Sequence, residues 1–150
     1  MKFFITGTRR GLGKALVEKY GTVESIEDCD VFINCKFDRF EQVFLLYKAA
    51  ELGKRIINIS SNTADGRKHT MYAVYKSALD DLNDRLYYEG IPTTSIRFGF
   101  FDTPRVAHVD KHKMPVSYCI DVIDWILKQP YIVKEITITP EVKNGKTAII

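Results

Sequence analysis

Short runs of apolar residues alternate with longer amphipathic stretches along the chain. Five runs rich in Ile, Val and Phe are typical of strands, and they cover 2–6, 31–34, 55–60, 93–98 and 135–139. Between them, apolar residues recur every three or four positions, which predicts helices over 13–20, 40–52, 71–89 and 117–128. This alternation predicts an α/β fold with right-handed βαβ units on a parallel sheet.

The stretch between the first predicted helix and the second of these strands is unusually short. Residues 21–29 leave room for a tiny strand around 22–25 and a turn, but a further crossover helix needs about a dozen residues. No linker or repeat interrupts the pattern, so we expect residues 1–150 to form one domain, with 141–150 as a loosely held polar tail.

Composition narrows the class of protein. Hydrophobic residues make up 45% and charged residues 27%, an ordinary globular balance, and no apolar run approaches the ~20 residues of a membrane helix. A net charge of +3 is too weak to indicate a nucleic-acid partner. Three cysteines without a C-x-x-C pair suit a reducing compartment, and few apolar residues precede Gly7, so we expect a cytoplasmic protein without a secretory leader or membrane partner.

A glycine-rich turn joins the first predicted strand to the first helix. Residues 6–13 read Thr-Gly-Thr-Arg-Arg-Gly-Leu-Gly, and such glycines allow a pyrophosphate to approach the free N–H groups of a helix start. The expected dinucleotide contacts are Gly7, Thr8, Arg9, Arg10, Gly11, Leu12 and Gly13.

Two residue sets bear on the choice between NADP and NAD. Arg9 and Arg10 are suited to clamp an adenosine 2′-phosphate, which favours NADP. An NAD enzyme would place an acidic residue after a second strand, and Glu24 or Asp28 are the candidates for that role. We therefore expect NADP, with NAD as the less favoured cofactor.

Tyr72 and Lys76 lie four positions apart on a predicted helix, so they share one face. A nearby ammonium favours the phenolate, which makes a tyrosine usable as an acid/base group. Ser61 follows the predicted strand 55–60 at the carboxyl edge of the sheet, where a hydroxyl can hold a substrate carbonyl. The order of glycine turn, strand-end serine and Tyr-x-x-x-Lys is more specific than any one of these features.

With these motifs the chain resembles the short-chain dehydrogenase/reductase family, as an unusually short member. The resemblance also rests on Asp-Val-Phe-Ile-Asn at 30–34, Asn-Ile-Ser-Ser at 58–61, and Gly99 followed four positions later by Thr103. It implies a Rossmann-like, doubly wound parallel sheet. By the same resemblance Tyr72 is the acid/base, and Lys76 binds the nicotinamide ribose and lowers the pKa of Tyr72.

The resemblance assigns further roles in the site. It implies that Ser61 orients the carbonyl, that Asn34 lies along the adenosine, that Thr103 in the turn with Gly99 contacts the nicotinamide carboxamide, and that Arg10 matches the basic residue of NADP-preferring members. Helices such as 40–52 and 71–89 commonly pair with their mates in this family, so a homodimer or homotetramer is expected.

The chain also departs from the family pattern. Cys35-Lys36-Phe37 follows Asn34 in place of Asn-Ala-Gly, Phe98 replaces a proline, and the loop 101–116 is a short substrate lid. The asparagine usual on the middle helix is absent, with Gln42 as a distant candidate for its role. The short 21–29 stretch indicates a sheet trimmed on the adenosine-binding side.

The expected function is NADP(H)-dependent interconversion of a small-molecule carbonyl and alcohol. The alternative is a non-catalytic dinucleotide-binding regulatory or interaction protein on the same scaffold. His108, Asp110 and His112 are too few and too isolated to predict a metal site, and the basic clusters at 67–69 and 111–113 are interpreted as solvated surface.

Overall fold

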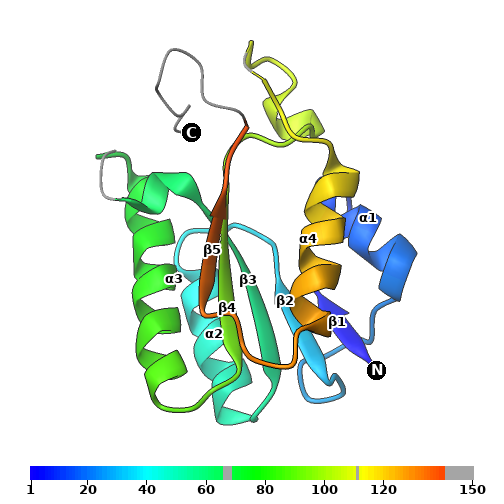
Figure 1. The fold of residues 1–150 in the computed structure, drawn as a ribbon, viewed down its shortest axis with the longest axis vertical. Coiled ribbons are helices and arrows are strands. Elements are labelled where there is room, and N and C mark those ends of the chain that lie inside the picture. The colour runs from blue at the N-terminus through cyan, green and yellow to red at the C-terminus, as the bar shows by residue number, and fades with distance from the viewer. Residues whose placement is uncertain (66–68, 111, 141–150) are drawn as a thin grey trace.

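A computed structural model describes residues 1–65, 69–110 and 112–140 of the chain, and all structural statements below refer to these residues (Figure 1). The strands are β1 (Phe3–Ile5), β2 (Val31–Asn34), β3 (Arg55–Ser61), β4 (Thr93–Phe98) and β5 (Glu135–Ile138). The helices are α1 (Gly11–Tyr20), α2 (Glu41–Glu51), α3 (Met71–Tyr88) and α4 (Val116–Lys128), with short 3₁₀ turns at Asn62–Asp65 and Pro104–Val106. The predicted strands and helices are confirmed, and their ends shift by no more than two residues. The predicted tail, 141–150, lies outside the described residues.

The strands form a parallel sheet in the order β1-β2-β3-β4-β5, as the pattern of short apolar runs predicts. Phe3 pairs with Val31, Val31 with Arg55, and Ile56 with Thr93, so the strands begin at one edge and end at the other. In this Rossmann-like α/β architecture every loop that follows a strand reaches the same carboxyl edge.

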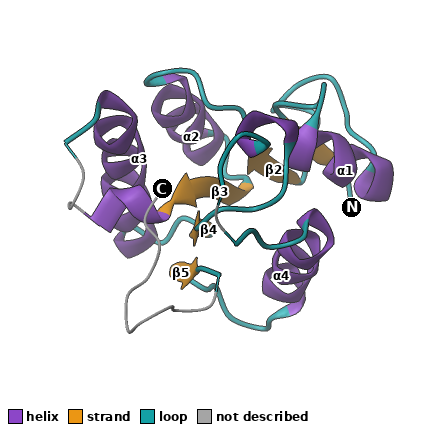
Figure 2. Cartoon of the chain, turned by 90° about the horizontal axis from the view of Figure 1, so that it is seen from above, coloured by secondary structure: helices purple, strands orange, loops and turns teal. Residues whose placement is uncertain are grey.

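The helices cover both faces of the sheet. Leu16 of α1 and Ile123 of α4 share one core with Ile57 and Ile96. Leu46 of α2 and Leu79 of α3 belong to the other core, on the opposite face. Figure 2, which looks onto the carboxyl edge, shows α2 and α3 on one side of the strands and α4 on the other.

The hand of the crossovers differs between the two faces. Because the strands are added in sequence order in one direction, helices on opposite faces give crossovers of opposite hand. Followed in Figure 2, the crossovers through α2 and α3 are right-handed. The expectation of right-handed units throughout is therefore wrong for α1 and α4. For α1 the reason is the short 21–30 segment, which leads directly into the neighbouring strand.

Residues 21–23 lie along the outer edge of β1 without forming a strand, so the predicted tiny strand is wrong. The Val23 N–H donates to the Phe3 carbonyl at 2.7 Å, and the Ile5 N–H donates to Thr22 Oγ1 at 3.1 Å. Together these two bonds satisfy edge groups of β1 that another strand would otherwise pair. The described sheet therefore ends at β1, in agreement with trimming on that side.

Replacing Thr22 by valine tests this edge. The substitution keeps the shape of the side chain but removes the acceptor for the Ile5 N–H. We expect the free energy of unfolding to fall by about 1 kcal/mol, measured by urea denaturation. The exposed neighbour Glu24, changed to glutamine, serves as the control and should shift stability by less than about 0.5 kcal/mol. Equal stabilities of Thr22→Val and the parent chain would contradict this account of the edge.

Candidate active site

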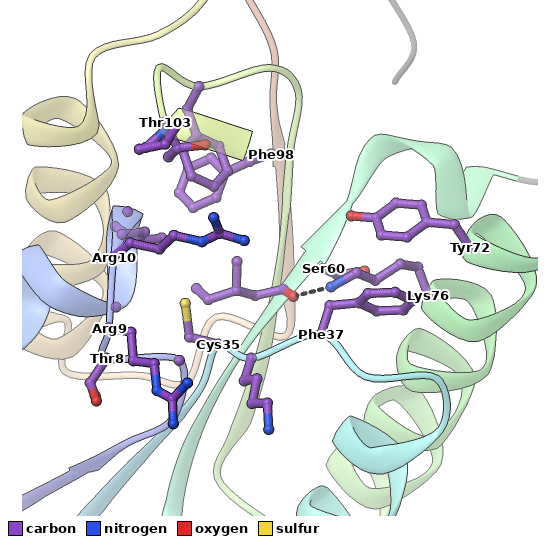
Figure 3. Close-up of a pocket in the computed structure, with 18 residues that line it drawn as sticks. Thr8, Arg9, Arg10, Cys35, Phe37, Ser60, Tyr72, Lys76, Phe98 and Thr103 are labelled. Atoms are coloured by element: carbon purple, nitrogen blue, oxygen red, sulfur yellow. Dashed lines mark hydrogen bonds between the residues drawn. The ribbon is translucent and has the colours of Figure 1, made fainter. Parts of the chain in front are cut away.

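A cavity of about 540 Å³ opens at the carboxyl edge of the sheet, between the start of α1 and the start of α3 (Figure 3). One wall is the glycine-rich turn, and the facing wall comes from α3 and the end of β3. The segments that follow β2 and β4 complete it. The lining residues are Gly7, Thr8, Arg9, Arg10, Gly11, Leu12, Gly13, Cys35, Lys36, Phe37, Ile59, Ser60, Tyr72, Lys76, Phe98, Phe101, Thr103 and Pro104.

The geometry of the glycine-rich turn suits an anion. Gly7 has φ +73°, and a Cβ on Gly13 would lie 2.0 Å from the Gly7 carbonyl oxygen, so the turn and α1 are in backbone contact that only glycine permits. No side chain caps the N-terminus of α1 at Arg10. The first N–H groups of a helix lack intrahelical partners, and here they lie beside a cavity. This cradle fits a phosphate or pyrophosphate.

The turn is fixed to the neighbouring strand by a threonine hydroxyl. Thr6 Oγ1 accepts hydrogen bonds from the backbone N–H groups of Cys35 and Lys36, at 3.0 and 3.1 Å. The turn and the end of β2 therefore form one rigid rim of the cavity.

Tyr72 and Lys76 project from the first turns of α3, as their spacing predicts. Thr70 caps this helix, since its Oγ1 accepts the Ala73 N–H at 3.2 Å. Figure 3 shows the Tyr72 hydroxyl directed into the cavity. The Lys76 side chain is buried, and its Nζ donates to Gln42 Oε1 and to the Ile59 carbonyl, each at 2.8 Å. Lys76 Nζ also lies 5.6 Å from the centre of the Tyr72 ring.

Gln42 is the residue of this wall whose importance sequence reasoning underrated. Its Nε2 donates to the Asn34 and Ile59 carbonyls at 2.8 and 3.1 Å, which aims Oε1 at Lys76. Asn34 Nδ2 in turn donates to the Gln42 carbonyl and to Asn58 Oδ1. Gln42 is 2% exposed. The signal available in the sequence was its position four residues before Leu46, on the apolar face of the predicted helix.

The two adjacent serines lie differently. Ser60 lines the cavity, and its side chain is buried. Ser61 is not among the lining residues, and its Oγ accepts hydrogen bonds from the backbone and hydroxyl of Thr63. Successive strand residues face opposite sides of a sheet, so only one of the two can point toward α3. The role expected for Ser61 stays a prediction, while Ser60 is the hydroxyl beside Tyr72 and Lys76.

Structure comparison finds close likeness to dehydrogenases of known structure, whereas no family model and no curated protein matches the sequence. The chain superimposes on a 3-alpha-hydroxysteroid dehydrogenase from Pseudomonas sp. B-0831 complexed with NADH, with TM-score 0.69, 14% identity, and coverage of 93% of this chain and 94% of that chain. The chain has the short-chain dehydrogenase/reductase fold.

Two further structures show the same likeness. A short chain dehydrogenase from Burkholderia cenocepacia J2315 in complex with NADP gives TM-score 0.69 at 16% identity, over 91% of this chain and 89% of that chain. An alcohol dehydrogenase from the archaeon Thermococcus sibiricus, complexed with 5-hydroxy-NADP, gives 0.67 at 18% identity, over 92% and 96%. The TM-scores establish the short-chain dehydrogenase/reductase fold. The sequence identities are too low to establish the activity, which is argued from the site.

The residues that depart from the motifs of short-chain dehydrogenases/reductases gather at the cavity. The Phe37 ring packs edge-on against Tyr72, with centroids 4.7 Å apart, and lies 5.4 Å from Lys76 Nζ. Burial raises the pKa of the Cys35 thiol to about 11, although Lys76 acts in the opposite direction. Cys35 therefore lines the cavity as a neutral thiol near pH 7. Phe98, in place of the expected proline, is another lining residue.

The charges around the cavity are of one sign. Arg9, Arg10, Lys36 and Lys76 line it, and none of the described lining residues is acidic. Figure 3 shows the Arg10 guanidinium reaching into the cavity from the glycine-rich turn. Such a lining attracts polyanionic ligands.

Glu24 and Asp28, the candidates for a ribose contact, do not lie at this edge. Their segment joins the end of α1 to the start of β2, and the Lys54 ammonium beside the start of β3 donates to the Glu27 carbonyl there. Parallel strands begin at the edge opposite the cavity. The alternative NAD contact through Glu24 or Asp28 is therefore wrong, because the strand that would carry such a residue to the carboxyl edge is missing from the described sheet.

Of three other expected cofactor residues, one lines the cavity and two do not. Thr103 lines the cavity, and its Cγ2 would lie 3.4 Å from a Cβ on Gly11, so the lid crosses the glycine-rich turn. Asn34 and Gly99 are not lining residues. Asn34 is fully buried, and a Cβ on Gly99 would lie 2.8 Å from Pro140 Cδ. Their cofactor roles stay predictions, and the structure gives both residues a packing role.

Three further features were considered in the sequence: a metal site, a membrane span and two basic clusters. Among the described residues there is no group of three or more His, Cys, Asp or Glu side chains arranged to hold a metal ion. None of the described helices is long and apolar enough to cross a membrane. Of the basic clusters, residues 67, 68 and 111 lie outside the described residues.

Breaking the Gln42–Lys76 contact should destabilise the protein, because the buried ammonium of Lys76 loses an acceptor. Gln42→Leu removes a hydrogen bond to an ammonium together with two bonds to carbonyls, so we expect the free energy of unfolding to fall by about 3 kcal/mol. Lys76→Met added to Gln42→Leu removes the buried charge that has lost this acceptor. A double-mutant cycle in urea should therefore show a coupling of at least about 1.5 kcal/mol.

The exposed pair Glu27–Lys48 provides the control cycle. Its 2.8 Å contact is as short as that of Gln42 and Lys76, but both side chains are about half exposed, so solvent screens it. We expect little coupling there. Additive losses at Gln42 and Lys76 would show that their contact does not hold this wall together.

Proposed function

We propose that this protein is a nicotinamide-dinucleotide-dependent oxidoreductase that interconverts a carbonyl and an alcohol, with NADP as its preferred cofactor. The observation that carries the proposal is the meeting of an uncapped, glycine-lined helix start with Tyr72 and Lys76 across one cavity. The dehydrogenases of the same fold, three of them complexed with NADH, NADP or 5-hydroxy-NADP, support the cofactor class.

The residues that would hold the cofactor belong to the two rims of the cavity. The backbone N–H groups at the start of α1 would bind the phosphates, and Arg9 and Arg10 would bind a 2′-phosphate. Thr103 would contact the nicotinamide side from the lid. When bound, the nicotinamide supplies or accepts the hydride.

Tyr72 is the acid/base in this proposal. In the reducing direction its hydroxyl donates a proton to the substrate oxygen, and in the oxidising direction the phenolate takes it back. The ammonium of Lys76, held by Gln42 and the Ile59 carbonyl, stabilises the phenolate electrostatically. A serine hydroxyl at the end of β3 orients the substrate oxygen. The sequence assigns this role to Ser61, whereas the serine that lines the cavity is Ser60.

Removing the Tyr72 hydroxyl should abolish turnover and spare binding. A carbonyl substrate is first found by following NADPH oxidation with a panel of small aldehydes and ketones. With it, Tyr72→Phe should lower kcat by about 10²–10⁴-fold, while the dissociation constant for NADPH changes little. Tyr75→Phe, one turn away on α3, is the matched control and should retain activity. Equal turnover by Tyr72→Phe and the parent chain would refute Tyr72 as the acid/base.

The preference for NADP is tested at Arg10. Loss of a charge-assisted hydrogen bond to a 2′-phosphate should weaken NADPH binding in Arg10→Ala by roughly 10–100-fold, with a smaller effect on NADH. Fluorescence titration of the reduced nicotinamide measures both constants. Lys14→Ala removes the same charge from an exposed position of α1 and should leave the NADPH to NADH ratio unchanged. An unaltered ratio in Arg10→Ala would locate the discrimination elsewhere.

The alternative function is non-catalytic dinucleotide binding by a regulatory or interaction protein. Two observations favour it. The Phe37 ring covers Lys76 and Tyr72 from the side of β2. Ser61 is engaged with Thr63 outside the cavity. Saturable NADPH binding without oxidation by any carbonyl of the panel would support this alternative.

The remaining parts of the proposal concern context. We propose a cytoplasmic protein with a small-molecule substrate that assembles as a homodimer or homotetramer. The outer faces of α2 and α3 expose Phe44, Tyr47 and Val74, and this apolar surface supports pairing of these helices with those of a second copy.

A further inference from the structure

We infer that the site recognises the nicotinamide nucleotide half of its cofactor and contacts the adenosine half through its phosphate groups alone, so that reduced nicotinamide mononucleotide (NMNH) is itself a ligand. This inference rests on the proposed function and specifies which part of the cofactor the chain contacts.

The first observation is where the sheet ends. A dinucleotide in a doubly wound sheet lies across the point where strand order reverses, with one half over the strands on each side. Here the order runs from β1 to β5 without reversal, and residues 21–23 bond to the outer edge of β1. Among the described residues, no strand beyond β1 provides a carboxyl end for the adenosine half.

The second observation is the composition of the cavity lining. After Gly13 the next lining residue in the chain is Cys35. The residues between them form α1, the segment at the opposite edge and β2 itself, and they supply no side chain to the cavity. The lining residues Tyr72, Lys76, Phe98 and Thr103 come instead from the side of β3 and β4, where the nicotinamide would lie.

The third observation is the kind of group available near the glycine-rich turn. Arg9, Arg10 and Lys36 carry full positive charges, and the described lining there contains no acidic side chain to pair with ribose hydroxyls. Charges of this kind act on phosphates whatever is attached to them. Affinity should therefore follow phosphate charge and fall with salt, whereas loss of the adenosine itself should have little effect.

NADH and NMNH make a matched pair for the test. The pyrophosphate of NADH and the monophosphate of NMNH each carry about −2 charge at pH 8, so the two ligands differ mainly in the adenosine. Fluorescence titration of the parent chain with NADPH, NADH and NMNH should give dissociation constants for NADH and NMNH within about threefold of each other, with NADPH tighter than both. In competition, 5′-AMP should bind at least tenfold more weakly than the mononucleotide.

Three outcomes overturn some part of this inference. NADH binding a hundredfold tighter than NMNH, or 5′-AMP binding as tightly as the mononucleotide, would show that the adenosine is recognised and would leave the proposed function standing. If NADPH, NADH and NMNH all fail to bind, the proposed function fails, and this inference fails with it.

Variants at the edge of the sheet opposite the cavity test whether the adenosine ribose contacts the 21–29 segment. Glu24→Ala and Asp28→Ala alter the acidic residues of the segment that replaces the missing strand. We expect neither to change the NADH dissociation constant by more than about twofold. A tenfold loss in either variant would place the adenosine ribose against this segment and contradict the inference.

Discussion

Burial of one ammonium group constrains the whole wall of the cavity that bears Tyr72. An unpaired buried charge costs far more than a protein of this size can sacrifice, so Lys76 must meet acceptors wherever α3 packs. It meets Gln42 Oε1 and the Ile59 carbonyl, which belong to α2 and β3. The positions of α2, β3 and α3 relative to one another are thereby fixed. Tyr72, one turn earlier on α3, takes its position from this arrangement.

The opposite wall is positioned by different physics. There, α1 packs directly on the β1 turn through the Gly7–Gly13 backbone contact, and its apolar face shares a core with α4. The two walls use different faces of the sheet, and Thr6 joins the turn to the end of β2 that separates them. The cavity therefore lies where an apolar layer and a hydrogen-bonded polar layer meet at one sheet edge.

The sequence predicted most of the fold, because strands buried on both faces and amphipathic helices leave strong patterns. It also predicted that the turn, Tyr72 and Lys76 would meet, since all three follow from the carboxyl edge of a parallel sheet. The side of the sheet to which Ser61 points was harder to predict, because a shift of one residue in the strand register turns each side chain to the opposite face. Glu24 and Asp28 were misplaced because the pattern did not show at which edge the 21–29 segment lies. The hand of the α1 crossover was misjudged because this short segment leads α1 directly into the neighbouring strand, β2.

The contact between Gly13 and Gly7 bears on how such a chain changes over evolutionary time. A methyl group at Gly13 would separate α1 from the sheet, so selection for a folded protein preserves this glycine whether or not anything binds beside it. Arg10 lines the cavity and provides no side-chain cap for the helix. In a lineage that lost its ligand, the glycines would persist while Arg10 drifted, so the arginine is the better record of ligand binding.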